Sequence, residues 1–143
     1  MSAIGAAVGV AWELPQTALG VALLGLELAR GHIRSIDLTE TSRAGTRLVC
    51  ETTGAAISLG HVVLWCRESN RWHELDARNR DHELGHAVQS RILGPLYLPI
   101  VGVPSSARAV YAVIHRELRG HKWPRYYQGF PEAWADQLGG VAR

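Results

Sequence analysis

Cysteine is scarce in this sequence, with only Cys50 and Cys66 among 143 residues. Two cysteines are too few for the disulfide framework of a small secreted scaffold. They also lack the Cys-x-x-Cys spacing of a structural zinc site. Both fall in segments with a strand-like pattern, where they could be cross-strand neighbours. We interpret them as buried free thiols.

A long apolar run without charge is missing too. Residues 3–28 are strongly apolar, but Glu13, Gln16 and Glu27 interrupt them, whereas a membrane-spanning helix needs about 20 mainly apolar residues. The first residues, Met1-Ser2-Ala3, carry no basic side chain, so the positive start of a secretory signal peptide is not present. We therefore expect a soluble protein, cytoplasmic or delivered as an effector domain. Contact with a membrane is the less favoured alternative.

A strong charge of either sign is absent as well, because the formal net charge is +2. The densest basic stretch holds Arg67, Arg71, Arg78, Arg80 and Arg91. This stretch falls short of the basic stripe that binds nucleic acid, so we expect no nucleic-acid partner. With 47% hydrophobic and 20% charged residues, the composition is that of an ordinary globular protein. The length suits a single domain over residues 1–143.

One motif stands out from this background: His82-Glu83-Leu84-Gly85-His86, which reads His-Glu-x-x-His. On a helix, residues four apart are offset by roughly 40° and lie one turn above each other. Two imidazoles placed in this way can hold one Zn²⁺, and the glutamate beside the first histidine reaches a water on the same ion. The motif therefore predicts a zinc site with His82 and His86 as ligands and Glu83 as general base.

A second run, Glu132-Ala-Trp-Ala-Asp136, supplies what the first one lacks. Glu132 is the candidate third ligand, and a catalytic zinc with three protein ligands keeps one position for water. Asp136 lies one helical turn beyond Glu132 and can face the same cavity. There its carboxylate can accept the free N–H of a ligand histidine, most directly His82, and so hold the tautomer of that ring.

The chemistry of such a cluster follows from its charge. Two neutral imidazoles and one carboxylate leave a net positive charge on the zinc, which lowers the pKa of bound water toward about 7 and polarises a scissile carbonyl group. Glu83 is placed to take the proton of that water and to hand it to the leaving amine. The sequence thus predicts zinc-dependent hydrolysis of peptide bonds in a peptide or protein substrate.

The pattern of apolar residues predicts an α+β fold. Residues 14–29 fit a buried core helix, with Pro15 in its first turn and Gly31 just past its end. An apolar N-terminal helix of this kind would pack on the rest of the domain.

Alternation of polar and apolar residues then predicts three strands, at 32–38, 46–52 and 56–66. Short turns join them, so we expect a small antiparallel meander. Gly60 inside the third strand indicates a bulge or a close backbone approach. The edge of this sheet could pair with an extended peptide by strand addition.

The second half of the sequence predicts helices. Asp76 is a plausible N-cap for an active-site helix that runs to Leu93, and Gly85 within it suggests that something approaches closely there. Residues 96–104 read as a buried apolar connection. Ser105-Ser106 can cap a helix over 107–119. Pro131 then opens a short glutamate helix that Gly139-Gly140 ends.

The two runs together resemble the gluzincin branch of the zincin metallopeptidases, whose signature is His-Glu-x-x-His followed by Glu-x-x-x-Asp. The metzincin branch needs glycine and histidine further along the same helix, where this chain has Gln89 and Ile92. The resemblance implies a small sheet, an active-site helix and a separate glutamate helix, at the size of a minimal single-domain gluzincin. Residues 89–99 and 132–140 also resemble, more weakly, C-terminal metallopeptidase domains of bacterial polymorphic toxins.

Larger gluzincins have a further C-terminal domain that supplies a histidine or tyrosine to stabilise the oxyanion. This chain ends seven residues after Asp136, so we expect a substitute from within. The candidates are Tyr126, Tyr127 and His121, in the loop ahead of the glutamate helix.

Two other functions stay open at this point. One is a zinc-stabilised binding or scaffold domain without turnover, which a fourth protein ligand such as His121 would favour. The other is a membrane-acting toxin domain in which the apolar N-terminus matters more than the metal. We interpret His61 and His73 as ordinary polar residues.

Overall fold

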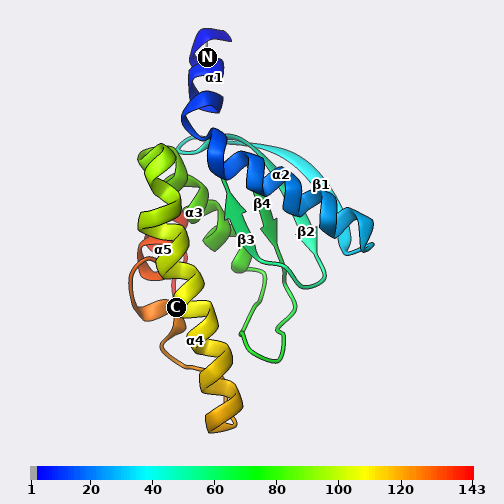
Figure 1. Ribbon diagram of the computed structural model, residues 1–143, viewed down its shortest axis with the longest axis vertical. Helices are drawn as coiled ribbons and strands as arrows, with labels where there is room; N and C mark the ends of the chain where they lie inside the picture. The colour runs from blue at the N-terminus through cyan, green and yellow to red at the C-terminus, as the bar shows by residue number, and fades with distance from the viewer. Residues whose placement is uncertain (1–2) are drawn as a thin grey trace.

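The computed structural model describes residues 3–143, with side chains from residue 8 onward, and the chain has the α+β fold that the sequence predicts (Figure 1). The helices are α1 (Ala3–Trp12), α2 (Leu14–Ala29), α3 (Asn79–Leu93), α4 (Val103–Arg119) and α5 (Glu132–Gly139). The strands are β1 (Ile33–Thr41), β2 (Gly45–Thr52), β3 (Ile57–Leu59) and β4 (Val62–Trp65). Shorter helical turns cover Gly94–Leu96, Leu98–Gly102 and Tyr126–Gln128.

The sheet lies between α2 on one face and α3 on the other (Figure 1). One core joins Leu24 of α2 to side chains of β2 and β4, and the second joins Ala87 and Val88 of α3 to the alternate side chains of the same strands. This division follows from the alternation of side chains along a strand. Cys50 and Cys66 are buried free thiols, as expected.

The strand order is β1-β2-β4-β3, which differs from the predicted meander. β2 and β4 run parallel, with Leu48 opposite Val62, and the other neighbouring pairs are antiparallel. Residues 56–66 form two strands rather than one, because Gly60 (φ 61°) lies in a tight turn and not in a bulge. The alternative expectation for Gly60, a close backbone approach, is confirmed, because an added Cβ would lie 2.8 Å from the backbone nitrogen of Thr17. All the residues of β4 are buried, whereas β3 is only partly so. An all-apolar strand is most stable where both of its faces are covered, so β4 takes the inner place and β3 the edge.

α2 has the predicted bounds, but the expectation of a buried core helix is wrong. Its buried residues are Gln16, Gly20, Leu24 and Glu27. Most of its leucines, and Val21, are exposed instead. The helix lies very close to the sheet at Gly20, where an added Cβ would lie 2.7 Å from the carbonyl oxygen of Leu59. The sheet therefore covers only a narrow strip of the α2 surface, and the rest of the helix, which is mostly apolar, is exposed to solvent.

The polar residues at the start of α2 point toward the interior because buried polar groups of β2 and α3 hydrogen-bond to them there. Glu13 and Arg47 are both fully buried, and a guanidinium nitrogen of Arg47 lies 3.0 Å from each carboxylate oxygen of Glu13. The hydroxyl of Ser90 on α3 donates to the same carboxylate at 2.6 Å. Gln16 donates to the Gly94 carbonyl at 2.9 Å. This polar cluster connects the junction of α1 and α2 to the C-terminal half of α3.

α3 and α4 begin at other residues than predicted. The Asp76 carboxylate accepts the backbone N–H of Arg78 at 2.8 Å and holds a turn ahead of the helix, so α3 begins at Asn79. α4 begins at Val103, because the apolar connection before it is itself helical. Ser105 therefore lies inside α4 and does not cap it.

α5 has the predicted bounds and lies directly on α3 through two glycines. A Cβ on Gly85 would overlap the carbonyl oxygen of Ala135, and a Cβ on Gly139 would overlap that of Asp81. Gly85 thus allows the close approach that its place in the motif suggested. The contact brings the first residue of α5, Glu132, to the histidines of α3.

Candidate metal centre

Two imidazoles and one carboxylate converge at the buried junction of α3 and α5. The Nε2 atoms of His82 and His86 lie 3.0 and 3.1 Å from the same atom, Oε2 of Glu132. All three side chains are buried, and their ligand atoms lie within 4.8 Å of one another. The structure thus brings together the three residues that the sequence nominates as metal ligands.

This arrangement fits a zinc ion. Ligand atoms of a tetrahedral zinc lie about 2.0–2.2 Å from the metal, which places any two of them about 3.3 Å apart. The two nitrogen–oxygen separations of 3.0 and 3.1 Å are close to that distance. Imidazole nitrogen and carboxylate oxygen are also donors that zinc accepts.

The electrostatics of the cluster favour a positive charge between these groups. Burial disfavours a charged imidazole, but hydrogen bonds to Asp136 and Glu132 outweigh it and raise the pKa of His82 to about 9. Burial likewise opposes a charged carboxylate, yet the two histidines hold the pKa of Glu132 well below its usual range. The buried carboxylates therefore stabilise a cation at this point, whether a proton or a metal ion.

Each imidazole is oriented by an acceptor on its other nitrogen. Nδ1 of His82 donates to Asp136 at 2.7 Å, and Nδ1 of His86 donates to the side-chain oxygen of Gln89 at 2.7 Å. The amide nitrogen of Gln89 donates to the Pro131 carbonyl at 3.0 Å, so its oxygen must face the ring. In the neutral form of each ring, with the proton on Nδ1, the Nε2 lone pair would be directed into the site, where it could bind a metal ion. The sequence nominates Asp136 for such a role but not Gln89, although Gln89 shares a helix face with His86.

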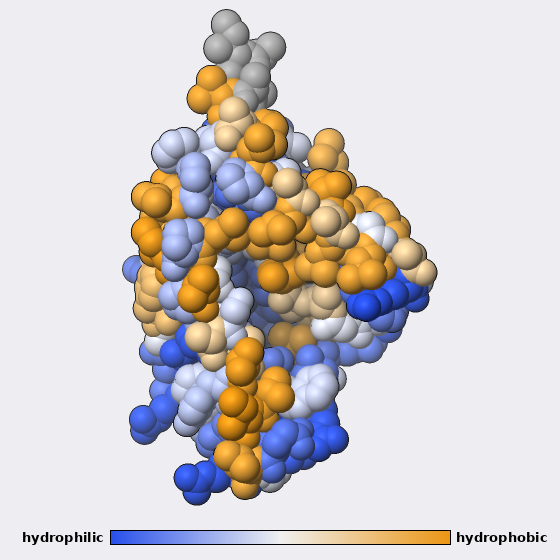
Figure 2. Space-filling view, viewed as in Figure 1, coloured by the Kyte–Doolittle hydropathy of each residue, from blue (hydrophilic) through white to orange (hydrophobic). Residues whose placement is uncertain are grey.

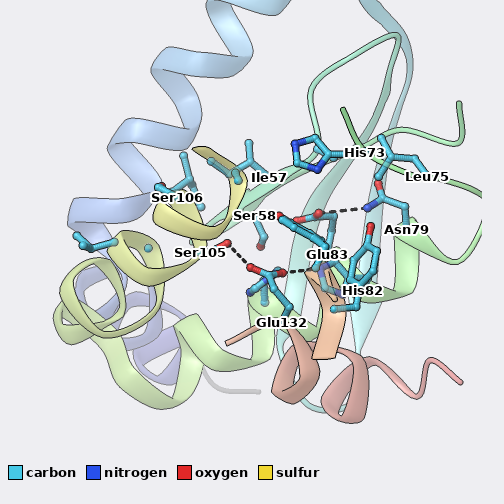
Figure 3. A pocket seen from close by; sticks show the side chains of 18 of the residues that line it. Ile57, Ser58, His73, Leu75, Asn79, His82, Glu83, Ser105, Ser106 and Glu132 are labelled. Carbon is cyan, nitrogen blue, oxygen red and sulfur yellow. Dashed lines mark hydrogen bonds and ion pairs between the residues drawn. The ribbon is translucent and has the colours of Figure 1, made fainter. Parts of the chain in front are cut away.

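A serine that the sequence does not single out holds the other oxygen of Glu132. Ser105 on α4 donates its hydroxyl to Oε1 of Glu132 at 2.6 Å (Figure 3). With Oε1 held in this way, Oε2 is presented to the imidazoles. The two residues are 27 positions apart on different helices, so no local pattern reveals their contact.

Glu83, the candidate general base, lies beside the ligands with 4% of its surface exposed. Asn79, one turn earlier on α3, donates to its Oε1 at 3.3 Å (Figure 3). Its Oε2 is buried and has no hydrogen-bond partner among the described residues. Burial raises the pKa of Glu83, and the neighbouring histidines only partly oppose this. A carboxylate with a raised pKa and a free oxygen is suited to accept a proton.

A cavity of about 690 Å³ opens beside these groups, a size suited to a small ligand or a few residues of a peptide (Figure 3). The edge strand β3 contributes Ile57 and Ser58 to its wall. α4 contributes Ser106 as well as Ser105. The loop before α3 contributes His73, whose pKa is lowered by burial. From the sequence we interpret His73 as an ordinary polar residue, and the structure places its partly buried side chain in the wall of the cavity.

The two tyrosines nominated for the oxyanion both line the cavity. The hydroxyl of Tyr127 donates to the Glu74 carbonyl at 3.0 Å, and its ring packs edge-on against His82. Tyr126 packs against His73 with ring centroids 4.9 Å apart, and its hydroxyl is not engaged by any described residue. Burial raises the pKa of both tyrosines, so both stay protonated donors. Tyr126 is the one whose hydroxyl is free to meet a ligand.

The structure does not bring His121 to this site. Its side chain is exposed beyond the end of α4, with its ring 4.9 Å from that of His115, and it does not line the cavity. In the described part of the chain, no further histidine, cysteine, aspartate or glutamate joins the three ligands. The cluster therefore offers three candidate metal ligands, the number that an open zinc site uses, rather than the four of a closed one.

Comparisons of the chain with protein-family models, with curated proteins and with solved structures find no match. The geometry and chemistry of the site are therefore the basis for assigning a function.

Proposed function

We propose that this protein is a zinc-dependent peptidase of the gluzincin type. The observation that carries the proposal is the convergence of two Nε2 atoms on one oxygen of Glu132, next to the unpartnered carboxylate oxygen of Glu83. Three ligands, a free base and an adjoining cavity are what metal-assisted hydrolysis requires.

His82, His86 and Glu132 would hold the metal. When bound, zinc supplies a Lewis acid that activates water and polarises a carbonyl group. Glu83 accepts the proton of the attacking water on its free oxygen and delivers it to the leaving amine. The hydroxyl of Tyr126 donates a hydrogen bond to the oxygen on which negative charge develops.

The substrate we propose is a peptide or protein segment in extended form. β3 is the edge strand of the sheet and lines the cavity, so a substrate lying along it would pass the ligands and Glu83. Apolar side chains such as Ile57 and Leu59 line that side of the cavity. Their presence favours apolar substrate residues next to the scissile bond.

The alternative of a silent zinc-stabilised domain is less well supported. A closed structural site has four protein ligands, and only three lie together in the described residues. A free general base also has no purpose in a purely structural site.

The test pairs metal analysis with cleavage of a mixed peptide library by the wild-type protein and by Glu83→Gln. We expect about one zinc ion per chain in both proteins and cleavage at least about a hundredfold slower in the variant. A chelator should abolish cleavage by the wild type, and added zinc should restore it. Undiminished cleavage by Glu83→Gln would remove Glu83 from its role. A zinc-loaded wild type that cleaves nothing in the library would support the binding-domain alternative.

A further inference from the structure

From residue 8, where side chains are described, to residue 29, the exposed surface of α1 and α2 is apolar without interruption. Every exposed residue between positions 8 and 29 is a hydrocarbon, aromatic, proline or glycine residue. Figure 2 shows this surface in orange around the base of α1 and along α2. We name it the N-terminal apolar face, made of Val8, Val10, Trp12, Leu14, Leu19, Val21, Leu26 and Leu28.

The two glutamates of this segment, Glu13 between the helices and Glu27 on α2, point the other way. Glu13 is fully buried against Arg47, and Glu27 is 5% exposed with its carboxylate 2.9 Å from His32. A helix on a water-facing surface has the reverse arrangement, with its charged residues outside. Helices that contact lipid place apolar residues outward and ionisable residues inward.

The border of the face is cationic. Arg30 is exposed at the C-terminal end of α2, 3.5 Å from Glu27, and Arg91 of α3 lies partly exposed near the start of α2, 3.7 Å from Glu13. The carboxylates of both pairs are buried, so the exposed side of each pair is the arginine. No carboxylate on the described part of α1 or α2 is exposed. The half-exposed ring of Trp12 donates its N–H to the Arg91 carbonyl at 3.1 Å. Arginine and tryptophan beside an apolar face are complementary to the anionic headgroups and interfacial zone of a bilayer.

We propose that the N-terminal apolar face binds the surface of an anionic lipid bilayer. None of the described helices combines the length and apolarity needed to cross a membrane, which agrees with binding in the interfacial layer. The described part of the face is apolar along its length with arginines at its border, and α1 projects beyond the body of the fold (Figure 1). An apolar layer edged by cations matches the hydrocarbon and anionic headgroup layers of a bilayer.

The cavity opens beside this face. Leu19 belongs to the face and also lines the cavity, with Leu98 and Val103 in the same lining. In Figure 2 the hollow lies between the apolar surfaces of α2 and α4. The substrates of the site would then be polypeptides held at a membrane surface. This consequence rests on the proposed peptidase function, whereas lipid binding does not.

The test is flotation of the full chain with vesicles of phosphatidylcholine and phosphatidylglycerol in equal parts. We expect the wild type to float with them and to bind pure phosphatidylcholine vesicles more weakly. Val21→Glu and Leu28→Glu should each reduce binding about tenfold or more, because a charge would enter the apolar layer. Leu118→Glu is the control, since Leu118 is 78% exposed but belongs to the C-terminal end of α4, at the opposite end of the molecule from α1 (Figure 1).

Circular dichroism would establish that each variant is folded. Glu83→Gln should bind vesicles like the wild type, which separates failure of this proposal from failure of the proposed peptidase function. The proposal is overturned if the wild type does not float, if folded Val21→Glu and Leu28→Glu bind undiminished, or if Leu118→Glu loses as much binding as they do. A protein that dimerises through this face in buffer and ignores vesicles would overturn it as well.

Discussion

Gln89 accepts a hydrogen bond from Nδ1 of His86 at 2.7 Å, one turn along the same face of α3. Replacing it by leucine removes the acceptor that holds this ring, so Gln89→Leu should weaken zinc binding about 10- to 100-fold. Competition with a chromophoric chelator measures the affinity. Gln89→Glu keeps an acceptor at the same position and should retain most of the affinity. Equal affinities for the wild type and Gln89→Leu would show that the ring needs no such partner.

Ser105 and Ser106 offer a matched pair of substitutions. Only the hydroxyl of Ser105 donates to Glu132, at 2.6 Å, although both residues line the cavity. We expect Ser105→Ala to weaken zinc binding about tenfold, because the ligand carboxylate loses the group that orients it. Ser106→Ala should leave the affinity unchanged. The same chelator titration checks both, and a similar loss in the two variants would contradict the role given to Ser105.

The buried pair of Glu13 and Arg47 should matter for stability. Arg47→Leu removes the hydrogen-bonded cation of the buried Glu13 carboxylate and leaves only Arg91, at 3.7 Å, which should cost about 3 kcal/mol in the free energy of unfolding. Urea unfolding of the metal-free protein measures this. Arg67→Leu is the control, because the pair of Arg67 with Glu51 is solvent-exposed on the arginine side and should contribute at most about 1 kcal/mol. If Arg47→Leu lowers the free energy of unfolding by less than about 1 kcal/mol, water must hydrate the Glu13 carboxylate in the variant.

The contact of α3 with α5 depends on the missing side chain at Gly85. A methyl group there would overlap the carbonyl oxygen of Ala135, so Gly85→Ala should destabilise the fold by about 1–3 kcal/mol and displace Glu132 from the histidines. Gly25→Ala is the matched control on α2, where an added Cβ meets nothing within 4 Å. That substitution should stabilise the helix by about 0.5–1 kcal/mol. Thermal unfolding and zinc content together check the pair, and a Gly85→Ala protein with unchanged stability and zinc content would refute the expectation.

Several features of the site could be predicted because they depend on residues close in the chain. The spacing of His82 and His86 decides that they share a helix face. The bounds of α2 and α5 follow from prolines at their starts and glycines at their ends. The convergence of Glu132 on the histidines, 50 and 46 residues away, is not local; it was predicted from the pairing of two motifs, and the structure shows it through contacts of 3.0 and 3.1 Å.

Other features arise only from contacts between distant segments. The partners Ser105 and His73 could not be found, because nothing in their own neighbourhood marks them as part of the cavity. The order of the strands was predicted wrongly for a similar reason. The alternation of polar and apolar residues shows which side chains share a face of a strand, but it does not show which strand lies in the middle of the sheet.

By itself, the sequence of this protein determines where most of its helices and strands form, and it places the two histidines and Glu83 on one helical segment. These are local properties, set by helix geometry and by turn residues. Tertiary structure alone decided that Glu13, just ahead of α2, and Glu27 within it turn inward, while most leucines of α2 turn outward. The spacing of polar and apolar residues shows which of them share a face of the helix, but it does not show which face is buried. That is decided here by the Arg47 guanidinium, which pairs with Glu13 from 34 residues away.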